Sequence, residues 1–408
     1  PREPDGGRLP EISMALASSN RAQVRYIPEA TFGVTPTTGN CINLRATGES
    51  LAFEIQTTTS QEIRADRQIT DVVQTGASTS GGVNMEFSYK EYDTLLEAVL
   101  QGTWAHFGTD GLGTAAAVTI DSTAGTLTWG TAPTGSSALT GLEVGQWFKL
   151  IAPGDAANGA YLKLASRTAT TITVAAATPI PGTGSRANVA NVQVKSSRVK
   201  NGTTQRSFSI EKEFADVAQF FLYKGMTASK LSLQFQSGSI VGGSFEFMGT
   251  VSTRAGATQL PGTPAASQAF DVMNAVSGVG NIYEAGVPLT NTFIKSINLD
   301  VDNALRGQDA IGTMGFVGIA SGTVSVGGAV EMYLANGTMY DKLVNNTSSS
   351  LSWFVRDGLG NGYVITADKV KFSGGGVTAG GLNQDVMLSM NWQGLMDSTG
   401  KTIAVDRL

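Results

Sequence analysis

The chain has very few of the residues on which most enzyme chemistry depends. Its 408 residues include a single cysteine, Cys41, and a single histidine, His106. One cysteine cannot form a disulfide within the chain, and one histidine leaves most zinc sites and imidazole-based catalytic arrangements without their ligands. We therefore expect both residues to be structural, and we predict neither a metal nor a cofactor.

Charged residues are also scarce, at 15% of the chain, compared with roughly 25% in typical soluble domains. The formal net charge is −5, which argues against a concentrated basic face that binds nucleic acid. A weakly charged surface favours a protein that partners cover over much of its area.

Long apolar runs are missing as well. No stretch of about 18 consecutive apolar residues occurs, so we expect no membrane insertion. The start of the sequence lacks the basic-then-apolar order of a signal peptide, which favours a protein made in a cytosol-like compartment. Residues 1–13 precede the first methionine, Met14, and play no part in the fold prediction.

Glycine, by contrast, is abundant, with 50 residues. Glycine combined with threonine, serine and valine in short alternating runs is typical of many short strands joined by tight turns. The sequence therefore predicts a mainly β fold.

An internal repeat divides the chain. Each copy has an alternating strand, a Gly-Gly pair in a second strand, Tyr-Asp at the start of a short helix, and then a series of strand hairpins. We expect the first helix at residues 89–101, with Gly102 as its C-cap, because apolar residues recur there at helical spacing. We expect the second helix after Gly337. The paired segments are 44–56 with 293–302, 76–100 with 318–344, and 206–249 with 350–394.

Residues 106–200 interrupt the first copy and have no counterpart in the second. Short Thr-, Val- and Ala-rich runs separated by turn residues predict a small inserted β-sandwich. The expected organisation is an N-terminal arm (1–19), a discontinuous first domain (20–105 and 201–255), the insert (106–200), a linker or long loop (256–289) and a second domain (290–408).

One polar segment, residues 57–71, is long for a hairpin loop and has no glycine or proline. It carries charges of both signs, at Glu62, Arg64, Asp66, Arg67 and Asp71. Long ordered loops tend to be functional, and mixed charge suits docking in a fixed register. We predict an interface role for this loop. The second copy has a shorter version, residues 302–309, with Asp302, Arg306 and Asp309.

Two other classes of function are weighed against a structural role. A polysaccharide-degrading enzyme needs two facing acids, and the pairs Asp66 with Asp71 or Asp300 with Asp302 are its only candidates. A bacterial surface-layer or carbohydrate-binding β-sandwich would carry acidic clusters or rows of exposed aromatics, and neither is evident. Motifs of nucleotide binding and of serine hydrolases are missing.

Residues 19–36 and 46–82 resemble the opening of the major tail tube proteins of siphophages. The resemblance implies tail-tube-type β-sandwich or barrel domains, each with one short helix, that build a continuous barrel around a lumen. It implies that the loop at residues 57–71 reaches the neighbouring ring, and that the insert is an Ig-like decoration on the outside.

The same resemblance implies a structural virion protein without catalytic activity, assembled in the host cytoplasm. Tail tubes usually present six tube domains per ring, so a duplicated chain would form a homotrimeric, pseudo-hexameric ring, with a hexamer left open. Other implied partners are the tape measure protein, the tail terminator, and DNA that passes through the lumen without specific binding.

Overall fold

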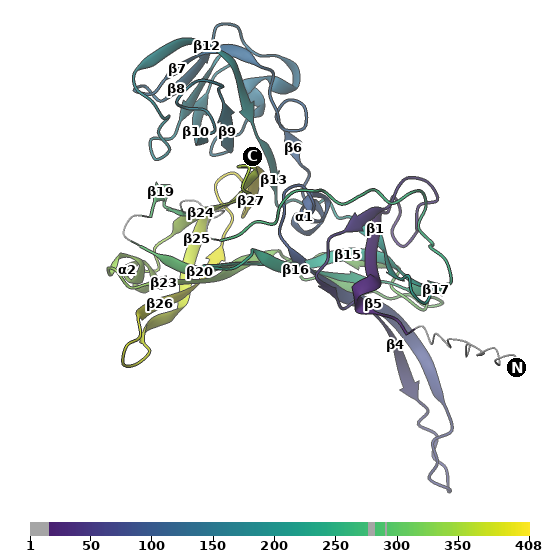
Figure 1. The fold of residues 1–408 in the computed structure, drawn as a ribbon. Helices are drawn as coiled ribbons and strands as arrows, with labels where there is room; N and C mark the ends of the chain where they lie inside the picture. The colour runs from purple at the N-terminus through teal and green to yellow at the C-terminus, as the bar shows by residue number, and fades with distance from the viewer. Residues whose placement is uncertain (1–15, 276–281, 290–291) are drawn as a thin grey trace, which may run out of the picture.

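The computed structural model describes residues 16–275, 282–289 and 292–408 (Figure 1). Most of the expected N-terminal arm and part of the expected linker lie outside these residues. The described part is built from strands, with two short α-helices, and this confirms the predicted mainly β fold.

The first half of the body surrounds the insert in sequence. Its elements are β1 (Ala22–Pro28), β2 (Ile42–Leu44), β3 (Gly48–Glu49), β4 (Ala52–Thr59), β5 (Val72–Glu86), α1 (Asp93–Leu100), β6 (Ala105–His106), β13 (Ser197–Lys200), β14 (Ser207–Phe214), β15 (Gln219–Gln236), β16 (Gly242–Gly249) and β17 (Ser252–Ala255).

The second half of the body follows without interruption by another domain. Its elements are β18 (Ile282–Glu284), β19 (Val287–Pro288), β20 (Ile294–Asp302), β21 (Arg306–Gln308), β22 (Gly318–Ala320), β23 (Ser325–Tyr333), α2 (Thr338–Val344), β24 (Ser349–Arg356), β25 (Gly362–Ala379), β26 (Val386–Gly394) and β27 (Ala404–Arg407).

Both halves repeat one pattern of strand pairing. In the first half β4 pairs with β5, β5 with β16, β16 with β15, and β15 with both β14 and β17, while β1 pairs with β14. In the second half the corresponding strands β20, β23, β26, β25, β24, β27 and β18 pair in the same order. All of these pairs are antiparallel, and α1 and α2 follow the equivalent strands β5 and β23.

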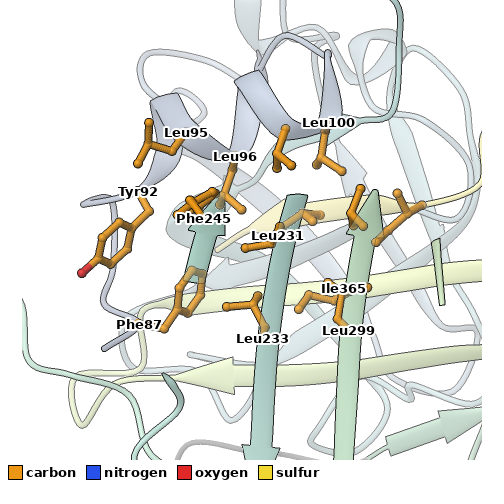
Figure 2. Packing of buried hydrophobic residues seen from close by; sticks show 14 of the residues in the cluster. Phe87, Tyr92, Leu95, Leu96, Leu100, Leu231, Leu233, Phe245, Leu299 and Ile365 are labelled. Carbon is orange, nitrogen blue, oxygen red and sulfur yellow. The ribbon is translucent and has the colours of Figure 1, made fainter. Parts of the chain in front are cut away.

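The two halves share one sheet and one core. β15 pairs with β20 over seven residue pairs, from Lys230 opposite Asp302 to Gln236 opposite Ser296. On the buried face Leu231 and Leu233 of β15 lie beside Leu299 of β20, under α1 (Figure 2). Within the paired residues, 230–236 and 296–302, apolar and polar residues alternate, so the apolar side chains of the junction lie on this one face.

Helix α1 covers that core with Leu95, Leu96 and Leu100, as the helical spacing predicted (Figure 2). It begins at Asp93 rather than at residue 89, because Lys90 has a φ of 62°, which a right-handed helix cannot contain. The left-handed residue at its end is Gln101, with a φ of 49°. Gly102 is not the C-cap but allows close packing, since a Cβ there would lie 2.1 Å from the Lys200 carbonyl oxygen.

The insert differs from the expected Ig-like sandwich, because its six strands pair in a closed ring. They are β7 (Ala116–Asp121), β8 (Thr126–Trp129), β9 (Trp147–Ile151), β10 (Tyr161–Arg167), β11 (Thr171–Val174) and β12 (Ser185–Lys195). The ring runs β7, β8, β11, β10, β9, β12 and back to β7 around its own apolar core. Alternation predicts half-buried strands in a sandwich and a barrel alike, so the sequence pattern could not distinguish the two.

The base of the insert is fixed to the second half of the body. Arg198, where the chain leaves the insert, forms a buried ion pair with Asp406 of β27 at 2.7 Å, and the backbone N–H of Trp147 donates to the same carboxylate at 3.1 Å. Trp147 also packs against Phe354 and Leu408. The insert therefore lies on the opposite side of the body from the hairpins β4–β5 and β25–β26 (Figure 1).

We expect Asp406→Ala to lower the free energy of unfolding by about 3–5 kcal/mol, because it leaves the buried Arg198 guanidinium without its partner. Lys295→Ala removes an ion pair with Glu331 whose side chains are 43% and 36% exposed, so it serves as the control. It should change the free energy of unfolding by less than about 1 kcal/mol. Denaturant titration measures both, and equal effects would contradict the assigned role of Asp406.

Candidate assembly surfaces

β4 and the first part of β5 form a hairpin arm (residues 52–80) that extends away from the body, while the rest of β5 pairs with β16 in the body (Figure 1). β4 and β5 pair along its length, from Ala52 opposite Ser80 to Thr59 opposite Val72. The segment expected as a loop from residue 57 is therefore partly strand, and the connection without strand structure spans residues 60–71. The arm holds the predicted contact residues at its tip.

The structure brings two of those residues together. The Arg64 guanidinium donates two hydrogen bonds to the Asp66 carboxylate, at 2.9 and 2.7 Å, and holds the pKa of Asp66 below its usual range. Arg67 has a φ of 58°, and its N–H donates to the Arg64 carbonyl. The Asp71 carboxylate accepts the N–H of Val72 at the start of β5, while Glu62 is exposed. The tip is a locally ordered turn that presents charge to solvent.

Exposed apolar residues also lie on the arm, and the prediction from charge alone missed them. Ile63 is fully exposed, Ile69 is 71% exposed, and Val72 and Val73 are more than half exposed. Contiguous exposed apolar residues mark interaction surfaces. The signal was present in the sequence, since isoleucines alternate with charged residues through this segment.

The second-half segment predicted as a shorter loop, residues 302–309, does not project, and it belongs to a connection between β20 and β23 that is longer than the one in the arm. This connection crosses to the first half, where the Met314 carbonyl accepts the N–H of Ala77 at 2.6 Å. The Thr250 hydroxyl donates to the Phe316 carbonyl at 2.8 Å. Asp302 accepts the N–H of Ala304 and lies 3.4 Å from Lys230, while Arg306 and Asp309 are exposed. This docked loop (residues 303–321) is thus held within the chain.

The acid pairs considered for glycoside hydrolysis have structural partners. Asp66 is bound by Arg64 and Asp71 by the backbone of Val72. Asp300 accepts a hydrogen bond from Ser232 at 2.7 Å. These contacts fix loops and strand register.

Two of the strand edges without a partner in the described residues belong to the long strands β4 and β25. One is the outer edge of β4, which pairs only with β5. The other is the outer edge of residues 371–379 of β25, which pair only with β26. Val377 on this edge is 45% exposed. Unpaired edges with apolar side chains are templates for pairing with another chain.

The single cysteine and histidine have local roles. Cys41 is buried. His106 Nδ1 lies 2.9 Å from the Ser197 hydroxyl, and burial, with the nearby Arg407, lowers its pKa. Across the described residues no group of acids, cysteines and histidines has the geometry of a metal site. No helix in that part of the chain is long and apolar enough to cross a membrane.

Comparison with known proteins places the chain in a family. The family model for phage tail tube proteins matches residues 19–394, nearly the whole chain. No curated protein gives a significant match. The chain therefore belongs to the phage tail tube family, whose members are structural proteins of the virion.

Displacing the docked loop should make it sensitive to protease. A Cβ at Gly315 would lie 2.4 Å from the Thr250 hydroxyl oxygen, so Gly315→Val should push the loop off the first half. Limited proteolysis should then cleave residues 309–317 faster than in the wild type. Ile311→Ala, at a fully exposed position, is the control. Equal cleavage of all three proteins would show that the contact does not hold the loop.

Proposed function

We propose that this tail tube family member self-assembles into stacked rings that form the tube of a siphophage tail, the conduit for genome delivery. Each chain supplies two tube domains, and the insert decorates the outside. The observation that carries the proposal is the β15–β20 junction, where two units with the same strand pairing already form one continuous sheet. The same junction can be repeated between chains.

The internal repeat defines which residues of β25 correspond to the junction residues of β15. Ser232 lies opposite Ser244, and Gly376 lies opposite Ser389. Ser244 and Ser389 occupy the same position relative to the glycine that ends β16 and β26. Gly376 is therefore the counterpart of Ser232.

The internal repeat also defines which residues of β4 correspond to the junction residues of β20. Asp300 lies opposite Gly327, and Ala52 lies opposite Ser80. Gly327 pairs with Gln393, the residue before the glycine that ends β26. Ser80 pairs with Met248, the residue before the glycine that ends β16. Ala52 is therefore the counterpart of Asp300, and the outer edge of β4 is the counterpart of the paired edge of β20.

These equivalences predict the contact between neighbouring chains. Because Ser232 lies opposite Asp300 within the chain, Gly376 of one chain should lie opposite Ala52 of the next. Val377 is then the counterpart of Leu233, a fully buried core residue, and Leu51, just before β4 of the next chain, would cover it. The contact uses different surfaces on each partner, so it generates a ring when the rotation closes.

Ring size follows from the number of domains. A ring of six tube domains needs three chains, which gives a homotrimer with pseudo-sixfold symmetry; a hexamer of chains is the larger alternative. Closure would pair the free edge of β4 with that of β25, which removes the hazard of these two open edges. The insert lies on the side away from the hairpins, in keeping with a place on the outer wall (Figure 1).

The unburied face of the shared sheet suits a lumen through which DNA passes without specific binding. Alternation places small polar residues and acids on this face, and Lys230 and Lys295 there are close to Asp302 and Glu331. A face with few free cations does not retain phosphate. Its acids are Glu86, Glu246, Asp300, Asp302 and Glu331.

Contact between rings is assigned to the hairpin arm, through Glu62, Arg64, Asp66, Arg67 and Asp71 together with the exposed isoleucines. Head-to-tail stacking has no inherent end. The tape measure protein and the tail terminator are therefore the further partners in the proposal, and assembly takes place in the host cytoplasm.

A cysteine pair tests the contact between chains. Ala52→Cys with Gly376→Cys should form a disulfide between chains in assembled protein, because directly opposed residues of an antiparallel pair lie about 4.5–5.5 Å apart. Gly376 has space for a side chain, since no atom lies within 4 Å of the position that a Cβ would take there. Non-reducing electrophoresis should show a ladder that ends at three chains. Ala52→Cys with Ala379→Cys, about 10 Å out of register, should stay monomeric on the gel; the reverse result would refute the register.

Deleting residues 62–67 tests the arm. The variant should fold and form single rings but no tubes in electron micrographs, because the deletion removes most of the tip. Replacing only Arg64 and Asp66 with serine, which keeps the loop length, should weaken tube growth less. Normal tube growth by the deletion variant would rule out the arm as the contact between rings.

A further inference from the structure

The insert and the second half meet at a lysine and an asparagine. Lys195 is the last residue of β12 in the insert, and Asn361 lies in the turn between β24 and β25. Lys195 Nζ is 3.0 Å from Asn361 Oδ1. On its other side the Asn361 amide Nδ2 donates to Asp357 Oδ2 at 3.1 Å. An amine, a carboxamide and a carboxylate therefore lie in one row.

The surroundings of Lys195 increase the neutral share of its amine. Burial, helped by the nearby Lys149, Lys90 and Arg407, lowers the pKa of Lys195 to about 8. Its Nζ lies over the ring of Tyr89, 4.9 Å from the centroid. In the described part of the chain no carboxylate lies within ion-pair distance of it. A desolvated, neutral lysine amine is a nucleophile.

The turn that carries Asn361 holds the carboxamide in place. Asp357 is 7% exposed, and its Oδ1 accepts the backbone N–H groups of Leu359 and Asn361 at 2.9 and 2.8 Å. The Gly360 carbonyl in the same turn accepts hydrogen bonds from Lys149 and from the Tyr161 hydroxyl of the insert, each at 2.6 Å. Contacts from both sides thus fix the amide against the lysine, as proximity catalysis requires.

We propose that Lys195 and Asn361 form an intramolecular isopeptide bond, with Asp357 as the proton carrier. The neutral Nζ attacks Cγ of Asn361, and the Nζ–Cγ bond forms. Once that bond has formed, Nζ and Nδ2 are attached to the same carbon, and Asp357 Oδ2, which already contacts Nδ2, carries one proton from Nζ to Nδ2. The Cγ–Nδ2 bond breaks and ammonia leaves, so that amine and carboxamide become one secondary amide plus ammonia, with no oxidant or cofactor.

The bond would tie the insert to the second half of the body covalently. It would join residues 195 and 361 in addition to the ion pair of Arg198 and Asp406, so that the insert and the body would be connected at a second point. Such a link resists forced separation of the two parts, which hydrogen bonds alone do not.

The mass of the intact, denatured chain tests the proposal independently of tube assembly. After incubation of the folded protein at pH 8, the wild type should be lighter than its sequence mass by one ammonia. Its tryptic digest should contain one branched peptide that joins residues 195 and 361. Lys149→Arg is the matched control, because Lys149 reaches the same turn but contacts a backbone carbonyl; it should show the same loss. Lys195→Arg and Asp357→Asn should keep the full sequence mass.

Two results would overturn the proposal. The first is a wild-type chain that remains at its full sequence mass after prolonged incubation. The second is an ammonia loss without a branched peptide, since an Asn-Gly pair, such as Asn361 with Gly362, also loses ammonia when the asparagine cyclises onto its own backbone. The branched peptide separates these cases even if one variant folds poorly.

Discussion

The pairing of β15 with β20 is the constraint on which the rest of the structure depends. A β-sheet edge leaves backbone groups without partners, and here one half of the chain supplies the edge that the other half needs. Because β15 is buried on its apolar face, a slip of one residue would turn Leu231 and Leu233 away from the core. The junction therefore has a single register, and a protein built from repeats of it inherits that register.

The insert adds a second connection between the halves. Its chain enters and leaves through the first half, but its base is bound to the second half by Asp406, Phe354 and Leu408. The two halves also contact each other directly, since Tyr363 and Arg407 of the second half both bind Asp93 at the start of α1 in the first half. Relative rotation of the halves would break these buried contacts together with the sheet, so the angle between the halves is fixed. In a ring, that angle sets the curvature.

The sequence was sufficient for features that local pattern determines. Period-two alternation and glycine content predicted the β fold, and helical spacing placed Leu95, Leu96 and Leu100 on one buried face. Features that depend on distant contacts were not predictable in the same way. The docking of residues 303–321 depends on Gly315 lying against Thr250, and the closure of the inserted barrel depends on β9 and β12 meeting. The seam between Lys195 and Asn361 joins residues 166 positions apart.

The connections that follow the equivalent strands β4 and β20 differ, and this difference would affect how rings stack. After β4 the chain continues into a long projecting arm, whereas after β20 it turns back at Ala304, which has a φ of 45°, and binds the first half. A trimeric ring with six similar domains would therefore carry the arm on alternate domains. The inner sheet can then follow sixfold symmetry while the contacts between rings follow threefold symmetry. If the arms make the proposed contacts between rings, each arm would have to meet one particular half of a chain in the next ring. The duplicated chain would then allow only rotations between rings that superpose like halves, whereas a ring of six identical domains would also allow rotations that exchange the halves.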